Sequence, residues 1–140
     1  MSTNCNMLLD FVELIRRLLF NMDSRFYVSL ETARLLKEKG YNEKCITYYQ
    51  DNCKEIYYSF CGEKNSDWEE RCVSAPSKAE AIDWLESKGI IVDTSFYFSR
   101  GRWSVDIRRN DSWAYVALGE YYSTRLETEE AAIIKALELL

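Results

Sequence analysis

The five cysteines are the side chains of this 140-residue chain that could take part in the most kinds of chemistry, including metal binding and nucleophilic attack. The chain contains no histidine. Cysteine thiolates bind zinc or attack electrophiles, usually as CxxC pairs or beside a histidine. Neither arrangement occurs here, which excludes zinc sites of two cysteines and two histidines as well as Cys–His nucleophilic pairs. An odd number of cysteines without paired spacing predicts reduced, structural thiols. They are Cys5, Cys45, Cys53, Cys61 and Cys72.

The sequence carries no motif of the common catalytic or nucleotide-binding classes. The patterns GxGxxG, GxxxxGKS/T, GxSxG and HExxH are all missing. Acidic pairs such as Asp67 with Glu69 need a pocket that raises one pKa before they can act as acid and base. A magnesium site made of carboxylates alone is compatible with the sequence, but nothing favours it. We therefore predict no catalytic residue, no metal ligand and no cofactor; an enzyme whose site has no motif is the open alternative.

Arginines at both ends of one expected strand form the main local concentration of positive charge. Arg100 and Arg102 lie at its start and Arg108 and Arg109 at its end, a span of about 20 Å at roughly 3.3 Å per residue. These guanidinium groups would either contact phosphates or keep a strand edge soluble. The formal net charge of −5 favours the second interpretation, because phosphate-binding surfaces usually carry excess positive charge.

Trp68 lies among charged residues in the longest expected connection, residues 61–77. Gly, Asn, Ser and Pro mark this segment as a loop. A tryptophan on a loop either packs onto the core or is presented to a partner. We favour packing onto the core, because burial of its large ring is the more stabilising arrangement.

The elements that position these side chains are predicted to be two helices of similar sequence, each followed by a hairpin. VSLETARLLKEKGY (28–41) and SKAEAIDWLESKGI (77–90) both have the pattern of an amphipathic helix that ends at Lys-Gly. The helices are expected at 29–39 and 77–88. A shared helix–hairpin plan is the favoured explanation of the likeness, and a true duplication is the alternative.

The first hairpin is expected to turn at residues 51–52. A two-residue turn there would pair Cys53 with Gln50 and place Cys45 opposite Tyr58. Cys45 and Cys53 would then be too far apart along the ladder to form a disulfide.

The C-terminal half is predicted to follow an α-β-β-β-α order. In its middle strand Trp103, Val105 and Ile107 alternate with polar residues, so one face of an antiparallel sheet is expected to be buried. The strands are expected near 90–98, 102–109 and 113–122, and the closing helix at 126–139.

Two helix starts have the spacing of a capping box, in which a hydroxyl residue precedes a glutamate by three positions. These pairs are Ser77 with Glu80 and Thr124 with Glu127. The closing helix would then cover the sheet with four apolar side chains, Ile133, Ile134, Leu137 and Leu140.

The predicted fold class is therefore α+β, with two helix–hairpin units and an N-terminal hydrophobic helix. The units would be residues 1–73 and 74–140, with one compact domain sharing a core as the alternative. The expected helix at 7–20 has an apolar face wider than a surface helix needs. We favour its burial in the core; a homodimer or partner interface and a membrane-surface helix are the alternatives.

The N-terminal segment has no basic leader, and Asp10 and Glu13 interrupt its apolar run. We therefore expect neither a signal peptide nor a membrane-spanning helix. This expectation, together with the reduced cysteines, favours a cytoplasmic protein of a bacterial host cell.

The closing stretch STRLETEEAAIIKALELL (123–140) and the α-β-β-β-α order resemble the double-stranded-RNA-binding domain. In that family the second helix begins with a lysine-rich segment that lies across a major groove. Glu127, Glu129 and Glu130 take these positions here. Carboxylates at a helix N-terminus complement the helix dipole but repel phosphates. The resemblance therefore implies the scaffold without its usual RNA chemistry.

A second resemblance involves YVSLETARLLKEKGYNEKC (27–45), NSDW (65–68) and SAPSKAEAIDWL (74–85). These stretches are similar to an uncharacterised family of small proteins from gut Bacteroidales bacteria, their phages and mobile elements. The family has no activity to transfer, so the resemblance implies genomic context alone.

This context favours an acidic, non-catalytic accessory protein of a phage or mobile element that binds another protein. An anti-defence inhibitor or a modulator of host machinery is expected. The alternative is a nucleic-acid or nucleotide binder that uses the tyrosine-rich sheets and the hairpin arginines. The candidate partner surface comprises Trp68, Arg100, Arg102, Arg108, Arg109, Glu127, Glu129 and Glu130.

The reversed charge of the closing helix predicts no measurable binding of duplex RNA at physiological salt. Changing Glu127, Glu129 and Glu130 to lysine is expected to leave the chain folded, because these side chains are expected to face water, and to add weak, salt-sensitive affinity. Fluorescence anisotropy with a labelled RNA duplex measures both. Tight duplex binding by the unmodified chain would contradict the prediction.

Overall fold

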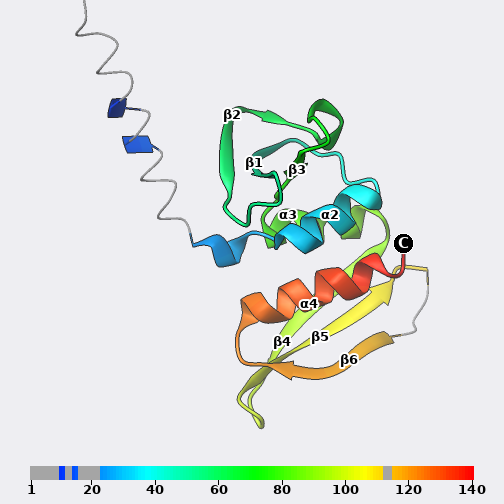
Figure 1. Cartoon of the computed structure of the whole chain (residues 1–140). Coiled ribbons are helices and arrows are strands. Elements are labelled where there is room, and N and C mark those ends of the chain that lie inside the picture. The colour runs from blue at the N-terminus through cyan, green and yellow to red at the C-terminus, as the bar shows by residue number, and fades with distance from the viewer. Residues whose placement is uncertain (1–9, 12–13, 16–22, 112–114) are drawn as a thin grey trace, which may run out of the picture.

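The computed structural model describes residues 10–11, 14–15, 23–111 and 115–140, and within them the fold is mixed α+β, as predicted (Figure 1). Three α-helices lie between two antiparallel three-stranded sheets. The helices are α2 (Leu30–Glu38), α3 (Lys78–Ser87) and α4 (Arg125–Leu137), with short 3-10 helices at Ser24–Phe26 and Asn65–Asp67. The strands are β1 (Cys45–Gln50), β2 (Tyr57–Glu63), β3 (Cys72–Ser74), β4 (Ile90–Tyr97), β5 (Arg102–Arg109) and β6 (Tyr115–Tyr122).

The helices begin where local hydrogen bonding predicts. At α3, Ser77 Oγ accepts from the Glu80 amide at 3.2 Å, and a Glu80 oxygen accepts from the Ser77 amide at 2.7 Å. The same reciprocal arrangement joins Thr124 and Glu127 at the start of α4. Both predicted capping boxes are confirmed, and they satisfy amides that the first helical turn leaves without backbone partners.

The register of the first hairpin differs from the prediction. The turn forms at Asp51-Asn52, where both residues have positive φ and the Cys53 amide donates to Gln50 O at 2.9 Å. Residues 53–56 then leave the ladder, which resumes with Tyr57 opposite Tyr48. A bulge shifts the pairing again, so Cys45 lies opposite Glu63 and the predicted pairing with Tyr58 is wrong.

The connection expected at 61–77 contains secondary structure that the sequence did not reveal. Its Cys72–Ser74 segment forms β3, which pairs antiparallel with β1. The first sheet therefore has the order β2-β1-β3, whereas the second has the order β4-β5-β6. The two units share a helix followed by a hairpin, but their third strands attach to different strands of that hairpin. This difference argues against the interpretation as a simple duplication.

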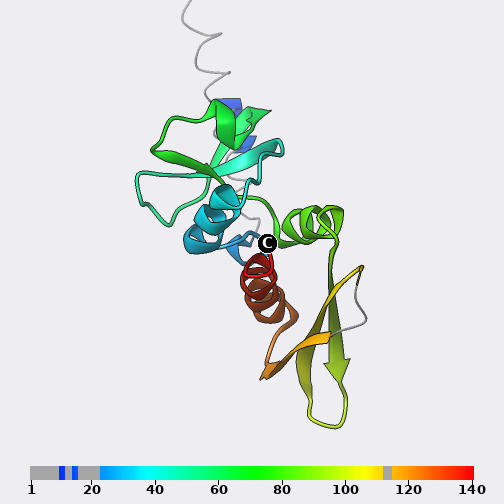
Figure 2. The ribbon, with the colours of Figure 1, turned by 90° about the vertical axis from the view of Figure 1, so that its right-hand side faces the viewer.

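The second sheet is covered on one face by α4 (Figure 2), and α3 packs against α4 and the start of β4. Val105 and Ile107 of β5 are buried, as their alternation predicts. Ile133 and Leu137 of α4 are also buried, but Ile134 and the following Leu140 are exposed. The other buried residues of α4 are Thr128, Glu129, Ala132 and Ala136, so the predicted four-residue apolar face is only half correct.

One hydrophobic cluster includes residues from both predicted units. Tyr41, after α2, meets Trp84 of α3 edge to face, with ring centroids 5.4 Å apart. The Tyr49 hydroxyl donates to Val28 O at 2.7 Å, and the Val28 amide donates to Pro76 O at 3.1 Å. These contacts bring residues 23–50 against the start of the second unit.

The described cysteines Cys45, Cys53, Cys61 and Cys72 are free thiols, which agrees with the predicted absence of a disulfide between the first two. Cys5 and most of the predicted helix at 7–20 lie outside the described residues. Within the described residues, no helix is long and apolar enough to cross a membrane.

The neighbouring residues Ile133 and Ile134 provide a matched test of the α4 packing. Changing Ile133 to alanine is expected to lower the free energy of unfolding by roughly 2–5 kcal/mol, because it leaves a cavity in the hydrophobic core against which α4 packs. The same change at the exposed Ile134 is expected to cost less than about 1 kcal/mol. Urea denaturation measures both values. Equal losses would contradict the observed face of α4.

Candidate functional site

The three glutamates at the start of α4 do not form one surface. Glu127 is exposed, and its carboxylate accepts from Ser123 Oγ at 2.7 Å and from the Thr124 amide at 3.2 Å. Those hydrogen bonds lower the pKa of Glu127. Glu129 is buried and pairs with Arg125 at 2.7 Å. The expectation that all three side chains face water is therefore wrong: Glu129 is buried, and Glu130 is half-buried.

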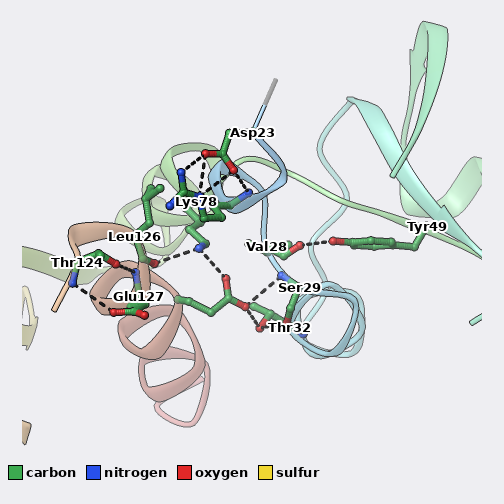
Figure 3. Close-up of polar contacts among 11 residues, drawn as sticks. Asp23, Val28, Ser29, Thr32, Tyr49, Lys78, Thr124, Leu126 and Glu127 are labelled. Carbon is green, nitrogen blue, oxygen red and sulfur yellow. Dashed lines mark hydrogen bonds and ion pairs between the residues drawn. The ribbon is translucent and has the colours of Figure 1, made fainter. Parts of the chain in front are cut away.

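The Glu130 carboxylate lies at the junction of the three α-helices. Figure 3 labels its partners Ser29, Thr32 and Lys78. One oxygen accepts hydrogen bonds from the Ser29 amide at 3.1 Å and from Thr32 Oγ1 at 2.5 Å, both at the start of α2. The other oxygen lies 3.5 Å from Nζ of Lys78, the first residue of α3. One side chain of α4 thus binds the N-terminal ends of both other helices.

Lys78 of α3 contributes the positive charge of this junction and contacts α4 at a second point. Its ammonium also donates to Leu126 O at 3.0 Å, and only 8% of its side chain is exposed, against 20% for Glu130. A buried ammonium needs a nearby anion, because its loss of hydration is costly. Both groups therefore make structural contacts, although the Glu130 oxygen that faces Lys78 accepts no hydrogen bond among the described residues and meets the ammonium only as an ion pair.

Trp68 is half-buried against the first sheet, and it is not among the residues of the described hydrophobic cluster onto which we favoured its packing. Its indole Nε1 donates to Ser74 Oγ at 3.0 Å, and its ring lies 4.4 Å from the Tyr48 ring. Asn65, which sequence reasoning did not identify, supports the same segment. Asn65 donates to Tyr41 O at 2.7 Å and accepts from the Ser74 amide at 2.9 Å, which attaches the connection to β3.

The four candidate arginines separate into two pairs at opposite ends of β5. Arg108 contacts Asp93 at 3.2 Å, and Arg109 donates to Leu139 O at 2.5 Å, so both serve contacts within the fold. Arg100 and Arg102 are exposed beside the loop that joins β4 to β5. The structure therefore does not bring the predicted arginines together as one surface.

A cluster of aromatic side chains lies beside Arg100 and Arg102. Phe98 is 89% exposed and Tyr97 is 51% exposed. Phe96 meets the Phe98 and Trp103 rings edge to face, with centroid separations of 5.2 and 5.5 Å. We define the hairpin tip as Phe96, Tyr97, Phe98, Arg100, Arg102 and Trp103.

Arg100 and Arg102 of the hairpin tip were among the predicted partner-surface residues, but its four aromatic residues were not, although their sequence contained a signal. The letters FYF at 96–98 fit a strand, and alternation assigns one face of a strand to the core. The hairpin instead extends beyond the part of the sheet that α4 covers, at the bottom of both ribbon views (Figures 1 and 2). Three consecutive aromatic residues directly before a turn were the available indication of an exposed tip.

No cluster of three or more cysteine, aspartate or glutamate side chains that could hold a metal ion occurs in the part of the chain that the structure describes. No protein-family model, curated protein or solved structure matches the chain. The resemblance to the double-stranded-RNA-binding domain and the resemblance to Bacteroidales proteins both therefore remain predictions.

The helix junction predicts unequal roles for two of the glutamates. Changing Glu130 to alanine is expected to lower the free energy of unfolding by roughly 3–5 kcal/mol, because it leaves the Lys78 charge buried without an anion. Glu127→Ala, at an exposed cap, is expected to cause a much smaller loss. Thermal and urea unfolding of both variants measure the difference, and similar losses would show that the junction is not important for stability.

The same geometry revises the expected outcome of the triple lysine replacement. A lysine at position 130 would place a second cation beside Lys78, so the triple variant is expected to unfold. Glu127→Lys alone changes the charge at an exposed position and is the appropriate variant for measuring the effect of charge on RNA binding.

Proposed function

We propose that this chain is a non-catalytic protein-binding protein whose partner docks on the hairpin tip. The observation that supports the proposal is the exposure of Phe98, which has 89% of its surface accessible. Aromatic residues and arginine are enriched at protein interfaces, and clustered exposed aromatics mark interaction sites. The hairpin tip combines both residue types at a protruding part of the molecule (Figure 1).

The ring contacts of the hairpin tip favour docking of a structured partner. Edge-to-face packing of Phe96 with Phe98 and Trp103 restricts these side chains before binding. Aromatic side chains that are already ordered lose little conformational entropy in a complex. Full burial of Phe98 in a partner pocket would make it the expected energetic centre of the interface.

The proposed biological setting comes from the resemblance to small Bacteroidales proteins. We place the chain in the cytoplasm of a bacterial host cell, as an accessory protein of a phage or mobile element. Inhibition of a defence system or modulation of host machinery fits a small acidic protein with one protruding contact surface. In this proposal the α3-to-α4 unit supplies a scaffold like that of the RNA-binding domain, used for protein contact.

A nucleic-acid binder is the second candidate, and the hairpin tip also favours it. Arg100 and Arg102 follow the exposed Phe98 closely in the chain, and bases of single strands stack on aromatic rings beside basic groups. The net charge of −5 opposes the approach of a polyanion over the rest of the surface. Protein binding is therefore preferred, and salt dependence separates the two candidates.

A homodimer through residues 7–20 is a separate proposal for assembly. The described residues Phe11 and Leu14 of this segment are helical and exposed. Light scattering with the double variant Phe11→Ser, Leu14→Ser distinguishes this interface from a partner surface at the hairpin tip.

The experiment is carried out in the native host, with a photo-crosslinking amino acid at position 98. In the control protein the same amino acid stands at position 46 of β1, which is also exposed. A discrete protein captured from position 98 but not from position 46 is then purified. Phe98→Ala is expected to weaken its binding by about 30-fold, corresponding to a loss of about 2 kcal/mol, while Ile46→Ala leaves the affinity unchanged.

Two results would contradict the proposal. Equal affinity of the Phe98→Ala and Ile46→Ala variants would remove the hairpin tip from the interface. Binding of a single-stranded RNA probe that depends on Phe98 and falls steeply with salt would replace protein binding with the second candidate. Unchanged unfolding curves establish that the exposed substitutions leave the fold intact.

A further inference from the structure

We infer that a pocket between α2 and β3 binds a small organic phosphate. The pocket has a volume of about 360 Å³, within the range of about 300–1,000 Å³ that holds small ligands. Its lining residues belong to α2, the strands β1 and β3 and the segments beside them. Figures 1 and 2 show α2 and the first sheet at the end of the molecule away from the β4–β5 turn. The inference is therefore independent of the proposed protein contact.

Three cationic side chains line this pocket from two directions. Arg34 and Lys37 lie about one turn apart on α2, and Arg71 precedes β3. Asp51 and Glu70 are the two carboxylates of the lining, so the formal charge of the pocket is +3 − 2 = +1. A local excess of positive charge in a chain of net charge −5 attracts an anion to this position.

The described contacts of the three cations leave donors for a ligand. Lys37 Nζ donates to Cys72 O at 3.2 Å, Arg34 donates to the Asn52 side chain, and Arg71 Nε pairs with Asp51 at 2.9 Å. An ammonium has three N–H groups and a guanidinium has five. The contacts also hold each side chain at the pocket, which reduces the entropy lost when a phosphate binds.

Buried side chains form the inner part of the lining and favour an organic ligand over a bare ion. Leu30, Tyr49 and Val73 line the pocket and are almost fully buried. The Tyr49 hydroxyl is committed to Val28 O, and burial raises its pKa to about 12. An apolar or aromatic part of a ligand would rest against these groups, while its phosphate meets the cations nearer to solvent.

Cys72 supplies a reporter for the site. Its thiol is partly buried in the lining, and burial raises its pKa, so the group stays neutral and does not repel an anion. Cys61 is exposed and lies outside the pocket lining. A ligand in the pocket is expected to slow alkylation of Cys72 and to leave alkylation of Cys61 unchanged.

The test measures alkylation of both cysteines by mass spectrometry, together with calorimetric titration. The probes are adenosine 5′-monophosphate and ribose 5-phosphate, with inorganic phosphate and adenosine as matched controls. We expect both organic phosphates to protect Cys72 selectively and more strongly than either control. Arg34→Gln or Lys37→Gln is expected to weaken binding by roughly tenfold or more. The control Lys44→Gln removes one exposed positive charge outside this pocket and is expected to have little effect.

Several outcomes would overturn the inference. They are a lack of protection at millimolar probe, equal protection of Cys72 and Cys61, and an equal loss of binding in Lys44→Gln. Inorganic phosphate acting as strongly as the organic phosphates would also overturn it, because the buried lining would then contribute nothing. If an α2 variant unfolds, Arg71→Gln applies the same test from the strand side of the pocket.

Discussion

The ion pair between Glu130 and Lys78 is the constraint on which the arrangement of the helices depends. The side chains of Lys78 and Glu130 are largely buried. Burial of either charge would be costly without the opposite charge of the other beside it. Glu130 also accepts from the Ser29 amide and the Thr32 hydroxyl. These directional contacts at the ends of α2 and α3 specify how the helices meet, whereas apolar packing alone tolerates rotation and sliding.

Features governed by neighbours in the sequence could be predicted. The capping boxes of α3 and α4 and the burial of Val105 and Ile107 follow from spacing and alternation. The three-residue strand β3 could not be predicted, because it is too short to show a period and exists through pairing with β1. The predicted pairing of β1 with β2 was wrong because residues 53–56 follow the turn without joining the ladder, which shifts the register. The residue types of this segment do not reveal that it leaves the ladder.

The candidate site was harder to predict than the fold. A glutamate early in a helix is ordinarily a solvated residue that complements the dipole, and Glu127 fits that description. Glu130 is partly buried between the helices because α2 and α3, which are distant from it in sequence, place hydrogen-bond donors beside its carboxylate. The exposure of Phe98 likewise depends on where α4 stops covering the sheet. Long-range packing therefore decided which polar groups are structural and which apolar groups are available to a partner.

The contact between Glu130 and Thr32 also constrains the order of events during synthesis. The two residues are 98 positions apart, which corresponds to roughly 5–20 s of translation at about 5–20 residues per second. During that interval α2 and the first sheet have emerged without the carboxylate that ties them to α3, and Lys78 must keep its hydration. The contact that joins α2 to α3 through this carboxylate therefore forms only after the second turn of α4 has been synthesised.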